Sequence, residues 1–183
     1  MLTAIIIAAV VVLLVGWAIA TYNSLVTQRN NCKEAFSTMD VYLKKRFDLI
    51  PNLVATVKGY AKHESETLEK VIAARNSGMH TTNAEKLEDE KAITGAVRQI
   101  FALSESYPEL KANTNFQDLQ SQLKSIEEDI ANSRKYYNGV VKIYNTKIQT
   151  IPTNIIAKFG HFEEQAMFQV DDASERKNVK VEF

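Results

Sequence analysis

The residues of this chain that could bind a metal or act in catalysis are three histidines, one cysteine and its carboxylates. The run His63-Glu64-Ser65-Glu66-Thr67 begins like the His-Glu-x-x-His motif of zinc proteases, in which two histidines one helical turn apart bind the metal. Thr67 stands where the second histidine is needed, and neither His80 nor His161 has a histidine at helical ligand spacing. We therefore expect surface polar groups here, and no metal or cofactor.

The single cysteine, Cys32, falls on the apolar side of a predicted helix. No histidine or helix N-terminus lies near it to lower its pKa, so a buried and inert thiol is expected rather than a nucleophile. One cysteine also excludes an intramolecular disulfide and a cysteine-based metal site. The chain has no nucleophile elbow, phosphate loop or dinucleotide fingerprint. The sequence therefore predicts a protein that is not an enzyme.

Polar side chains also interrupt the apolar faces of the predicted helices. They are Asp40, Arg75, Glu127, Arg134 and Asn138, and Tyr136, Tyr144 and Asn145 crowd the same long helix. Such a set could form a buried pocket or a switch. If the protein were an enzyme, we would expect a deep pocket lined by the two acids and the two arginines of this set, with a ligand bound in it. It could instead be a hydrogen-bonded network that fixes helix register. The positions follow the period of a helical bundle, which favours the structural interpretation.

The element that places the whole protein is an apolar run over residues 1–20, broken only by Thr3 and Gly16. As a helix it would measure about 29 Å, the thickness of a bilayer's hydrocarbon core. We expect residues 1–21 to form a membrane anchor that spans the lipid bilayer and contacts its lipids. Its lipid-facing side chains would be Leu2, Ile5, Ile6, Ile7, Val10, Val11, Val12, Leu13, Leu14, Val15, Trp17 and Ile19.

A cleaved secretory signal is the alternative to a retained anchor. Ala18-Ile19-Ala20 has the small-x-small pattern of a cleavage site. However, no Lys or Arg precedes the apolar run, and the run is longer than a signal core, so a retained anchor is favoured. Arg29 and Lys33, and then residues 44–46, place the basic flank after the anchor, which predicts an outside N-terminus and a cytoplasmic domain.

The residues after the apolar run are enough for one domain with a hydrophobic core, and composition indicates which class of protein this domain belongs to. The chain has 22 basic and 22 acidic residues and no net charge, so it lacks the basic footprint of a nucleic-acid-binding protein. Six glycines and three prolines are few, whereas good helix formers are abundant. We therefore expect an all-α protein with long helices and short connections.

The periodicity predicts that the anchor continues as one rod to about Phe47 and that Pro51 starts a second helix ending at Ser77-Gly78. A third helix follows over about 83–103 and a fourth over 115–151, where Pro152 ends it; residues 154–159 add a turn. The fourth carries an apolar heptad repeat, typical of a coiled-coil seam. Its positions are Phe116, Leu123, Ile130, Tyr137, Tyr144 and Ile151, interleaved with Leu119, Ile126, Ser133 and Val140.

These helices predict an antiparallel, coiled-coil-like four-helix bundle over residues 22–159 that continues from the transmembrane helix. A short extended tail follows over residues 160–183. In it, Val179, Val181 and Phe183 alternate with polar residues, as in a strand. This segment could bind a partner as an edge strand, fold back on the bundle or stay disordered.

Several of these stretches resemble the LemA family of bacterial membrane proteins. They are Tyr22-Asn23-Ser24-Leu25-Val26, residues 40–54 (DVYLKKRFDLIPNLV), Val57-Lys58-Gly59-Tyr60 with His63-Glu64, Ala74-Arg75, residues 107–113 (YPELKAN), residues 134–138 (RKYYN) and Tyr144-Asn145. One departure is Phe36, where relatives tend to carry tryptophan. The resemblance implies a single-pass protein of the bacterial cell membrane with a mostly helical soluble domain and no enzyme activity.

Two functions are compatible with this sequence. The first is a membrane-anchored scaffold that forms homo-oligomers through its heptad seam and organises membrane or partner proteins, because an anchor raises the effective concentration of its copies. The second is a monomeric adaptor that presents its tail, or the corner at residues 47–52, to another membrane protein such as a protease. Heptads alone do not distinguish packing within one chain from packing between chains.

Overall fold

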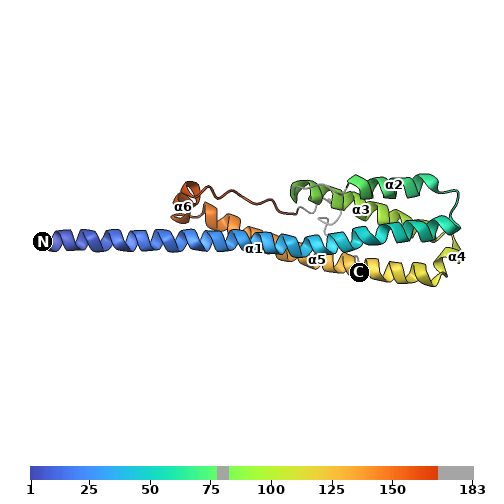
Figure 1. Ribbon diagram of the computed structural model, residues 1–183, viewed down its shortest axis with the longest axis horizontal. Coiled ribbons are helices and arrows are strands. Elements are labelled where there is room, and N and C mark those ends of the chain that lie inside the picture. Colours follow the sequence, from blue (N-terminus) through green and yellow to red (C-terminus); the bar gives the residue numbers. More distant parts are fainter. Residues whose placement is uncertain (78–82, 169–183) are drawn as a thin grey trace, which may run out of the picture.

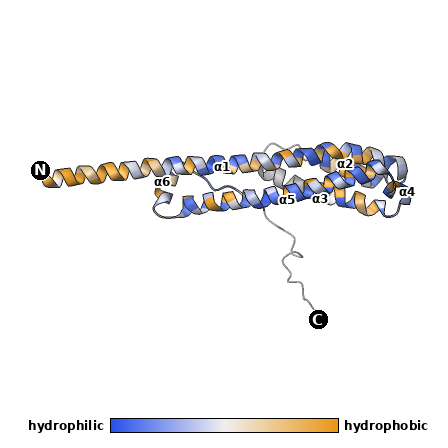
Figure 2. Ribbon diagram, turned by 90° about the horizontal axis from the view of Figure 1, so that it is seen from below, coloured by the Kyte–Doolittle hydropathy of each residue, from blue (hydrophilic) through white to orange (hydrophobic). Residues whose placement is uncertain are grey.

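One unbroken helix, α1 (Leu2–Tyr60), carries both the apolar run and a wall of the folded body. The computed structural model describes the backbone of residues 1–77 and 83–168. The 59 residues of α1 correspond to about 88 Å of helix. Its first part projects alone beyond the other helices, and this part is the most hydrophobic of the molecule (Figures 1 and 2). The described residues form helices and no strands, which confirms the all-α prediction.

The prediction of a helix break at Pro51 is wrong. Proline removes one backbone donor, so the carbonyl of Phe47, one turn earlier, loses its helical partner. Pro51 is exposed, so this carbonyl is on the water side of α1, where solvent can donate to it. The inward-facing Ile50 and Leu53 stay buried against the other helices, and this packing keeps the helix intact through the proline.

The chain turns back at the far end of α1, and two further helices pack there. They are α2 (Ser65–Ser77) and α3 (Asn83–Ser104), which lie together beside α1 (Figure 1). The short α4 (Pro108–Lys111) then leads into α5 (Thr114–Gln149). Asn113 caps α5, because its Oδ1 accepts from the Phe116 N–H at 3.0 Å while its Nδ2 donates to the Tyr60 hydroxyl at 2.9 Å.

The long helix α5 runs back along α1 in the antiparallel direction. Phe36 of α1 faces Tyr137 of α5, with ring centroids 5.6 Å apart, and Arg46 faces Glu127. At the end of the body nearest the apolar run the chain reverses into α6 (Thr153–Phe159), and an extended segment then follows the side of α5 to Phe168. The heptad seam of α5 is therefore used within one chain, against α1.

The body contains two hydrophobic clusters, one after the other along the rod. The far cluster joins α1, α2, α3, α4 and α5 and includes Leu53, Ile100 and Leu123. The near cluster joins α1, α5, α6 and the extended segment and includes Leu25 and Tyr144. Five described helices, the short α4 among them, thus contribute to the far half, whereas α1, α5, the short α6 and the extended segment form the near half.

The buried stripe of α5 drifts away from a strict heptad. Leu119 is buried at the far end, but Val141 and Ile148 form the second buried stripe at the end nearest the apolar run, one residue later than the predicted phase. A straight helix with 3.6 residues per turn shifts in this way relative to a seven-residue repeat. Ile151, predicted as the last seam position, lies beyond the end of α5 and is 78% exposed.

We expect Pro51→Ala to raise the thermal unfolding midpoint of the detergent-purified protein. Alanine restores the missing backbone hydrogen bond, and removing an interior helical proline can raise the free energy of unfolding by up to about 3 kcal/mol. Part of this gain is offset, because alanine leaves the unfolded chain more conformational freedom than proline does. Circular dichroism during heating measures this midpoint. Asn52→Ala, at the neighbouring exposed position, is the control. A lower midpoint for Pro51→Ala would contradict the prediction.

Candidate functional site

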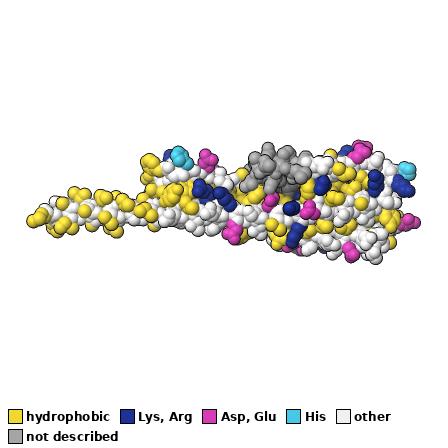
Figure 3. Space-filling model, in the orientation of Figure 1, with side chains coloured by type: hydrophobic (Ala, Val, Ile, Leu, Met, Phe, Trp, Pro, Cys, Tyr) yellow, Lys and Arg dark blue, Asp and Glu magenta, His cyan; other side chains and the backbone are white. Residues whose placement is uncertain are grey.

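The first part of α1 is the most exposed apolar surface of the molecule. Among the described residues, one helix is long and apolar enough to cross a membrane by length and composition, and its apolar window has none of its area buried in the body. In Figure 3 hydrophobic side chains cover this part all round the visible face, with no charged side chain among them. The predicted lipid-facing side chains from Leu2 to Ile19 all lie on this projecting helix.

The base of the body, where α6 meets α1, is built from aromatic and cationic contacts. Phe162 packs edge-on against Tyr22 with centroids 5.4 Å apart, and the Arg29 guanidinium lies 5.0 Å from the Phe162 ring centroid. Gly160 permits this approach, since a Cβ there would lie 2.5 Å from Phe162 Cε2. Lys147 of α5 donates to Ser24 Oγ of α1 at the same level. The body is thus fastened directly beyond the apolar run.

Four side chains of α5 hold the extended segment, and we call them the clamp: Tyr137, Asn138, Tyr144 and Asn145. Asn138 donates to the Phe168 carbonyl at 2.9 Å and accepts from the Phe168 N–H at 2.8 Å. The tyrosine beside it, Tyr137, donates its hydroxyl to the Ala166 carbonyl at 2.9 Å. Each asparagine amide therefore presents one donor and one acceptor to one backbone residue, as a neighbouring strand would.

The second half of the clamp repeats the first, seven residues later. Asn145 donates to the Gln165 carbonyl at 2.9 Å and accepts from the Gln165 N–H at 3.0 Å. Tyr144 donates to the Glu163 carbonyl at 3.0 Å. All of these bonds go to backbone atoms, so they hold an extended chain by its conformation rather than by its side chains.

The clamp tyrosines remain hydrogen-bond donors at neutral pH. Burial raises the pKa of Tyr137, and Cys32 adds to the rise. Burial also raises the pKa of Tyr144. The positive charge of Arg29 opposes this rise, whereas Cys32 and Glu163 add to it. Cys32 itself is buried and its pKa is raised by that burial, which confirms the prediction of a buried thiol.

A buried ionic junction separates the two hydrophobic clusters. Arg46 of α1 is only 1% exposed and binds Glu127 Oε1 of α5 at 2.8 Å. The same Nη1 donates to Thr94 Oγ1 of α3 at 2.8 Å. The junction of Arg46, Thr94 and Glu127 thereby links three helices at one level, and sliding α5 by one turn would separate the charges.

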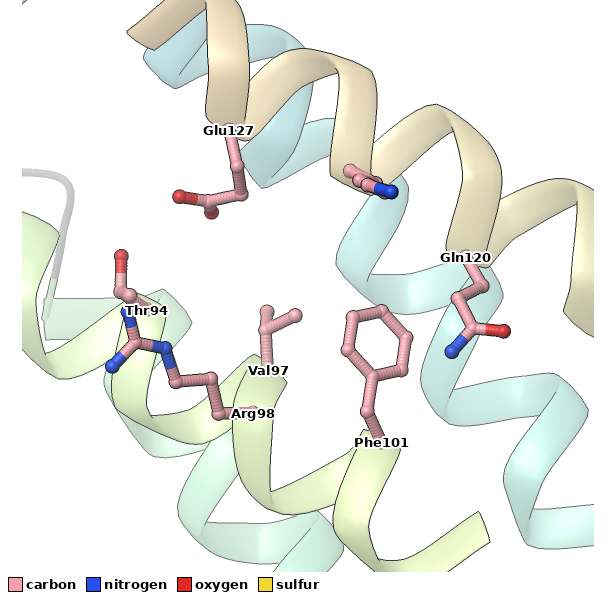
Figure 4. A pocket seen from close by; sticks show the side chains of 7 residues that line it. Thr94, Val97, Arg98, Phe101, Gln120 and Glu127 are labelled. Carbon is pink, nitrogen blue, oxygen red and sulfur yellow. The ribbon is translucent and has the colours of Figure 1, made fainter. Parts of the chain in front are cut away.

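A pocket of about 310 Å³ opens between α3 and α5 next to this junction. Figure 4 shows Val97 and Phe101 of α3 pointing toward α5, with Gln120 and Glu127 opposite them. The carboxylate at its edge is already bound to Arg46, and the rest of the lining combines apolar, neutral polar and cationic side chains. Its lining residues include no cysteine, histidine or serine that could act as a nucleophile.

The remaining predicted polar residues lie at separate places. Arg75 of α2 stacks on Phe47 of α1, with 4.5 Å from its guanidinium carbon to the ring centroid. Arg134 lies 5.3 Å from the ring of Phe168, beside Asn138, so these two predicted residues share the end of the extended segment. Asp40 is half-buried on α1. Val179, Val181 and Phe183 lie outside the described residues.

The zinc-protease-like run has a structural role in the described fold. His63 and Glu64 lie in the turn between α1 and α2, and Glu64 Oε1 accepts from the Tyr107 hydroxyl at 3.2 Å. Burial, and then this bond to Glu64, raises the pKa of Tyr107. Among the described residues, no group of three or more His, Cys, Asp or Glu side chains could hold a metal ion.

Sequence reasoning named Asn138, Tyr144 and Asn145 as members of a hydrogen-bonded network, but it missed their partner, the extended segment, and it missed the role of Arg46. Arg46 occupies the heptad series that runs through Leu25, Cys32, Met39 and Leu53, so a charge stands at a core position of α1. The dipeptide Tyr-Asn occurs twice, seven residues apart, on the face of α5 that carries the clamp. A polar residue at a core period predicts a specific partner, but not which one.

These features define an all-helical protein whose longest helix has a membrane-length apolar end and whose body is built on the remainder of that helix. The model of the LemA family matches residues 35–183. The chain belongs to the LemA family, as its sequence resemblance predicts.

Curated relatives span most of the chain. Protein LemA of Metamycoplasma hominis is 28% identical over 165 residues, which cover 87% of this chain and 73% of the relative. Magnetosome protein MamQ 2 of Paramagnetospirillum magneticum is 23% identical over 192 residues, covering 90% and 71%. Magnetosome protein MamQ of Magnetospirillum gryphiswaldense is 22% identical over 181 residues, covering 84% and 66%.

Changing a clamp asparagine to aspartate should release the extended segment without unfolding the body. In Asn138→Asp the donor to the Phe168 carbonyl is lost and a carboxylate faces that carbonyl, which costs about 1–3 kcal/mol. We expect the backbone amides around Phe168 to exchange hydrogen about 5- to 100-fold faster, since 1.4 kcal/mol corresponds to tenfold. Exchange measured by mass spectrometry tests this. Asn132→Asp, exposed on the same helix, should leave the rate unchanged.

Removing one side of the ionic junction should be worse than removing both. Glu127→Leu takes away the carboxylate that the buried Arg46 binds, and we expect a loss of about 1–3 kcal/mol, moderated because Glu127 is 35% exposed. The double variant Arg46→Met/Glu127→Leu should regain most of this loss. Urea unfolding in mild detergent measures both, with Glu128→Leu as an exposed control. A double variant less stable than Glu127→Leu would refute this account of the junction.

Proposed function

We propose that this protein is a non-enzymatic, membrane-anchored helical scaffold that self-associates at the cytoplasmic face of the bacterial inner membrane and organises membrane or partner proteins around it. The observation that carries self-association is an exposed apolar strip on the outer face of α5. Tyr136 and Ile143 lie one heptad apart on this face, and each is 60% exposed. Large apolar side chains in such a register favour packing against another helix.

The strip has the properties of a helix-packing surface. Exposed Gly139 lies between Tyr136 and Ile143, and nothing lies within 4 Å of where its Cβ would be. A partner helix could therefore approach the backbone of α5 closely at this point. The predicted heptad seam is occupied by α1 in the same chain, so this outer strip, rather than the seam, is the surface available to a second copy.

Continuity of α1 supports a retained anchor over a cleaved signal. Residues 18–20, the candidate cleavage site, lie inside a helix without a break, and Tyr22 just beyond them packs on Phe162. Cleavage there would require unwinding helix next to a packed contact. From residue 21 to its end, α1 rises about 58 Å, so the scaffold would hold its far end well away from the membrane.

The relatives named as magnetosome proteins support a role at membranes rather than in catalysis. Magnetosome protein MamQ 2 aligns over 90% of this chain, which includes most of the body. The carboxylate that lines the α3–α5 pocket is bound by Arg46, which supports a structural rather than a catalytic role for Glu127. The zero net charge of the chain argues against nucleic acid as its partner.

A monomeric adaptor is the second candidate, favoured by the clamp. Asn138 and Asn145 hold residues 165–168 by their backbone, so the segment that follows starts from a defined place on α5. Such an adaptor would present Val179, Val181 and Phe183 to another membrane protein. Deleting residues 178–183 would then abolish partner capture and leave the helical content unchanged.

Self-association is tested by the mass of the full-length protein in detergent, measured by light scattering. We expect a defined oligomer for the natural chain, and a shift to monomer for Tyr136→Lys/Ile143→Lys, because two charges on the strip oppose helix packing. Ile72→Lys introduces a charge on an exposed apolar position of α2 and should leave the mass unchanged. A monomeric natural chain at high protein concentration would overturn self-association and favour the adaptor.

A further inference from the structure

The membrane-proximal end of the body carries a second apolar surface, separate from α1 and from the strip on α5. It consists of Ile151, Ile155 and Phe159, spaced four residues apart across the α5–α6 turn and along α6, and we call it the base patch. These side chains are 78%, 52% and 82% exposed. The opposite side of α6 is packed, with Ala157 only 3% exposed. A protein surrounded by water alone has no evident reason to expose this set.

The position of α6 along α1 brings the base patch to the level where the apolar run ends. Phe162, just after α6, contacts Tyr22, and Tyr22 is only two residues beyond the apolar run. Figure 3 shows hydrophobic side chains at the end of the body from which the rod projects, continuous with those of the rod. Figure 1 places α6 at this same end. A bilayer crossed by the rod would therefore have its surface at α6.

We propose that the base patch inserts into the headgroup and upper acyl region of the same bilayer that α1 crosses, with α6 lying along the membrane surface. This inference rests on the proposed anchoring by α1 and deepens it. The exposed faces of short amphipathic segments bind the interface in this way, with apolar side chains buried among lipids. The partner of the patch is thus the lipid surface itself.

Charges around the patch match an anionic lipid surface. Lys158 is exposed on α6 next to Phe159, and Lys147 and Arg29 flank the base where they contact Ser24 and Phe162. Long basic side chains at this depth reach headgroup phosphates while their apolar stems stay among lipids. The exposed Glu163 and Glu164 follow on the extended segment beside the base, and Glu164 Oε1 accepts from Nε2 of Gln149, the last residue of α5, at 2.7 Å.

A second contact with the bilayer would fix the orientation of α1 relative to the membrane plane. A single spanning helix can tilt and can rotate about its own axis, and anchors at the interface set both. The base patch lies on one side of α1, so its insertion would lean the rod toward α6 and orient the outer face of α5 relative to the membrane plane. Copies oriented alike in two dimensions would meet through the same surface.

Tryptophan fluorescence tests this, because Trp17 is the only tryptophan of the chain. The full-length protein is reconstituted in vesicles of phosphatidylcholine and phosphatidylglycerol, with or without bromine on the upper acyl chain as a quencher. Phe159→Trp is made in a Trp17→Phe background, and Ile72→Trp in the same background is the matched control on α2, far from α6. Circular dichroism verifies that each variant keeps its helices.

We expect brominated lipid to quench about half or more of the Phe159→Trp emission, which would also be blue-shifted, and to leave Ile72→Trp unchanged. Quenching of Trp17 in the natural chain but not of Phe159→Trp would overturn the base-patch inference while leaving the anchor intact. Absence of quenching at both positions would overturn both proposals. A blue-shifted but unquenched Phe159→Trp emission would show that a second copy covers the patch, and would also overturn the inference.

Discussion

The unbroken helix α1 is the constraint on which the other parts of the structure depend. It supplies an apolar end of membrane length and, farther along, one wall of both hydrophobic clusters. The antiparallel α5 packs on α1 over nearly the whole length of α5. The register of this helix pair therefore determines which side chains of the two helices are in contact. The junction at Arg46, the clamp and the base of α6 all take their positions from it.

Polar contacts set that register where apolar contacts alone would permit sliding. Two heptad-patterned helices can exchange one turn for the next with similar apolar burial. Arg46 and Glu127 oppose this, since a shift would leave a buried guanidinium away from its carboxylate. The clamp adds a similar constraint at the near end, where an extended segment replaces two helices as the cover of α5. The hydrogen bonds of the clamp therefore occur in the half of the body where the fewest helices pack on α5.

The polar residues that the sequence offered for a catalytic pocket make structural contacts in the fold. Acids and arginines that could have formed a catalytic pocket are distributed instead to an ion pair and to aromatic rings, as Glu127, Arg75 and Arg134 illustrate. Among the apolar side chains that the body leaves exposed, Ile151, Ile155 and Phe159 lie at the base and Tyr136 and Ile143 lie on the outer face of α5.

The sequence by itself determined the all-α class, the apolar N-terminal helix of membrane length, the buried Cys32 and most of the α5 seam, because these follow from local periodicity and composition. It could not determine that α1 continues through Pro51, since packing of Ile50 and Leu53 offsets a local propensity. Tertiary structure alone decided that Arg46 meets Glu127 and that two Tyr-Asn pairs hold a distant backbone. Such partners are 81 and about 20–30 residues apart in sequence, and only the folded register brings them together.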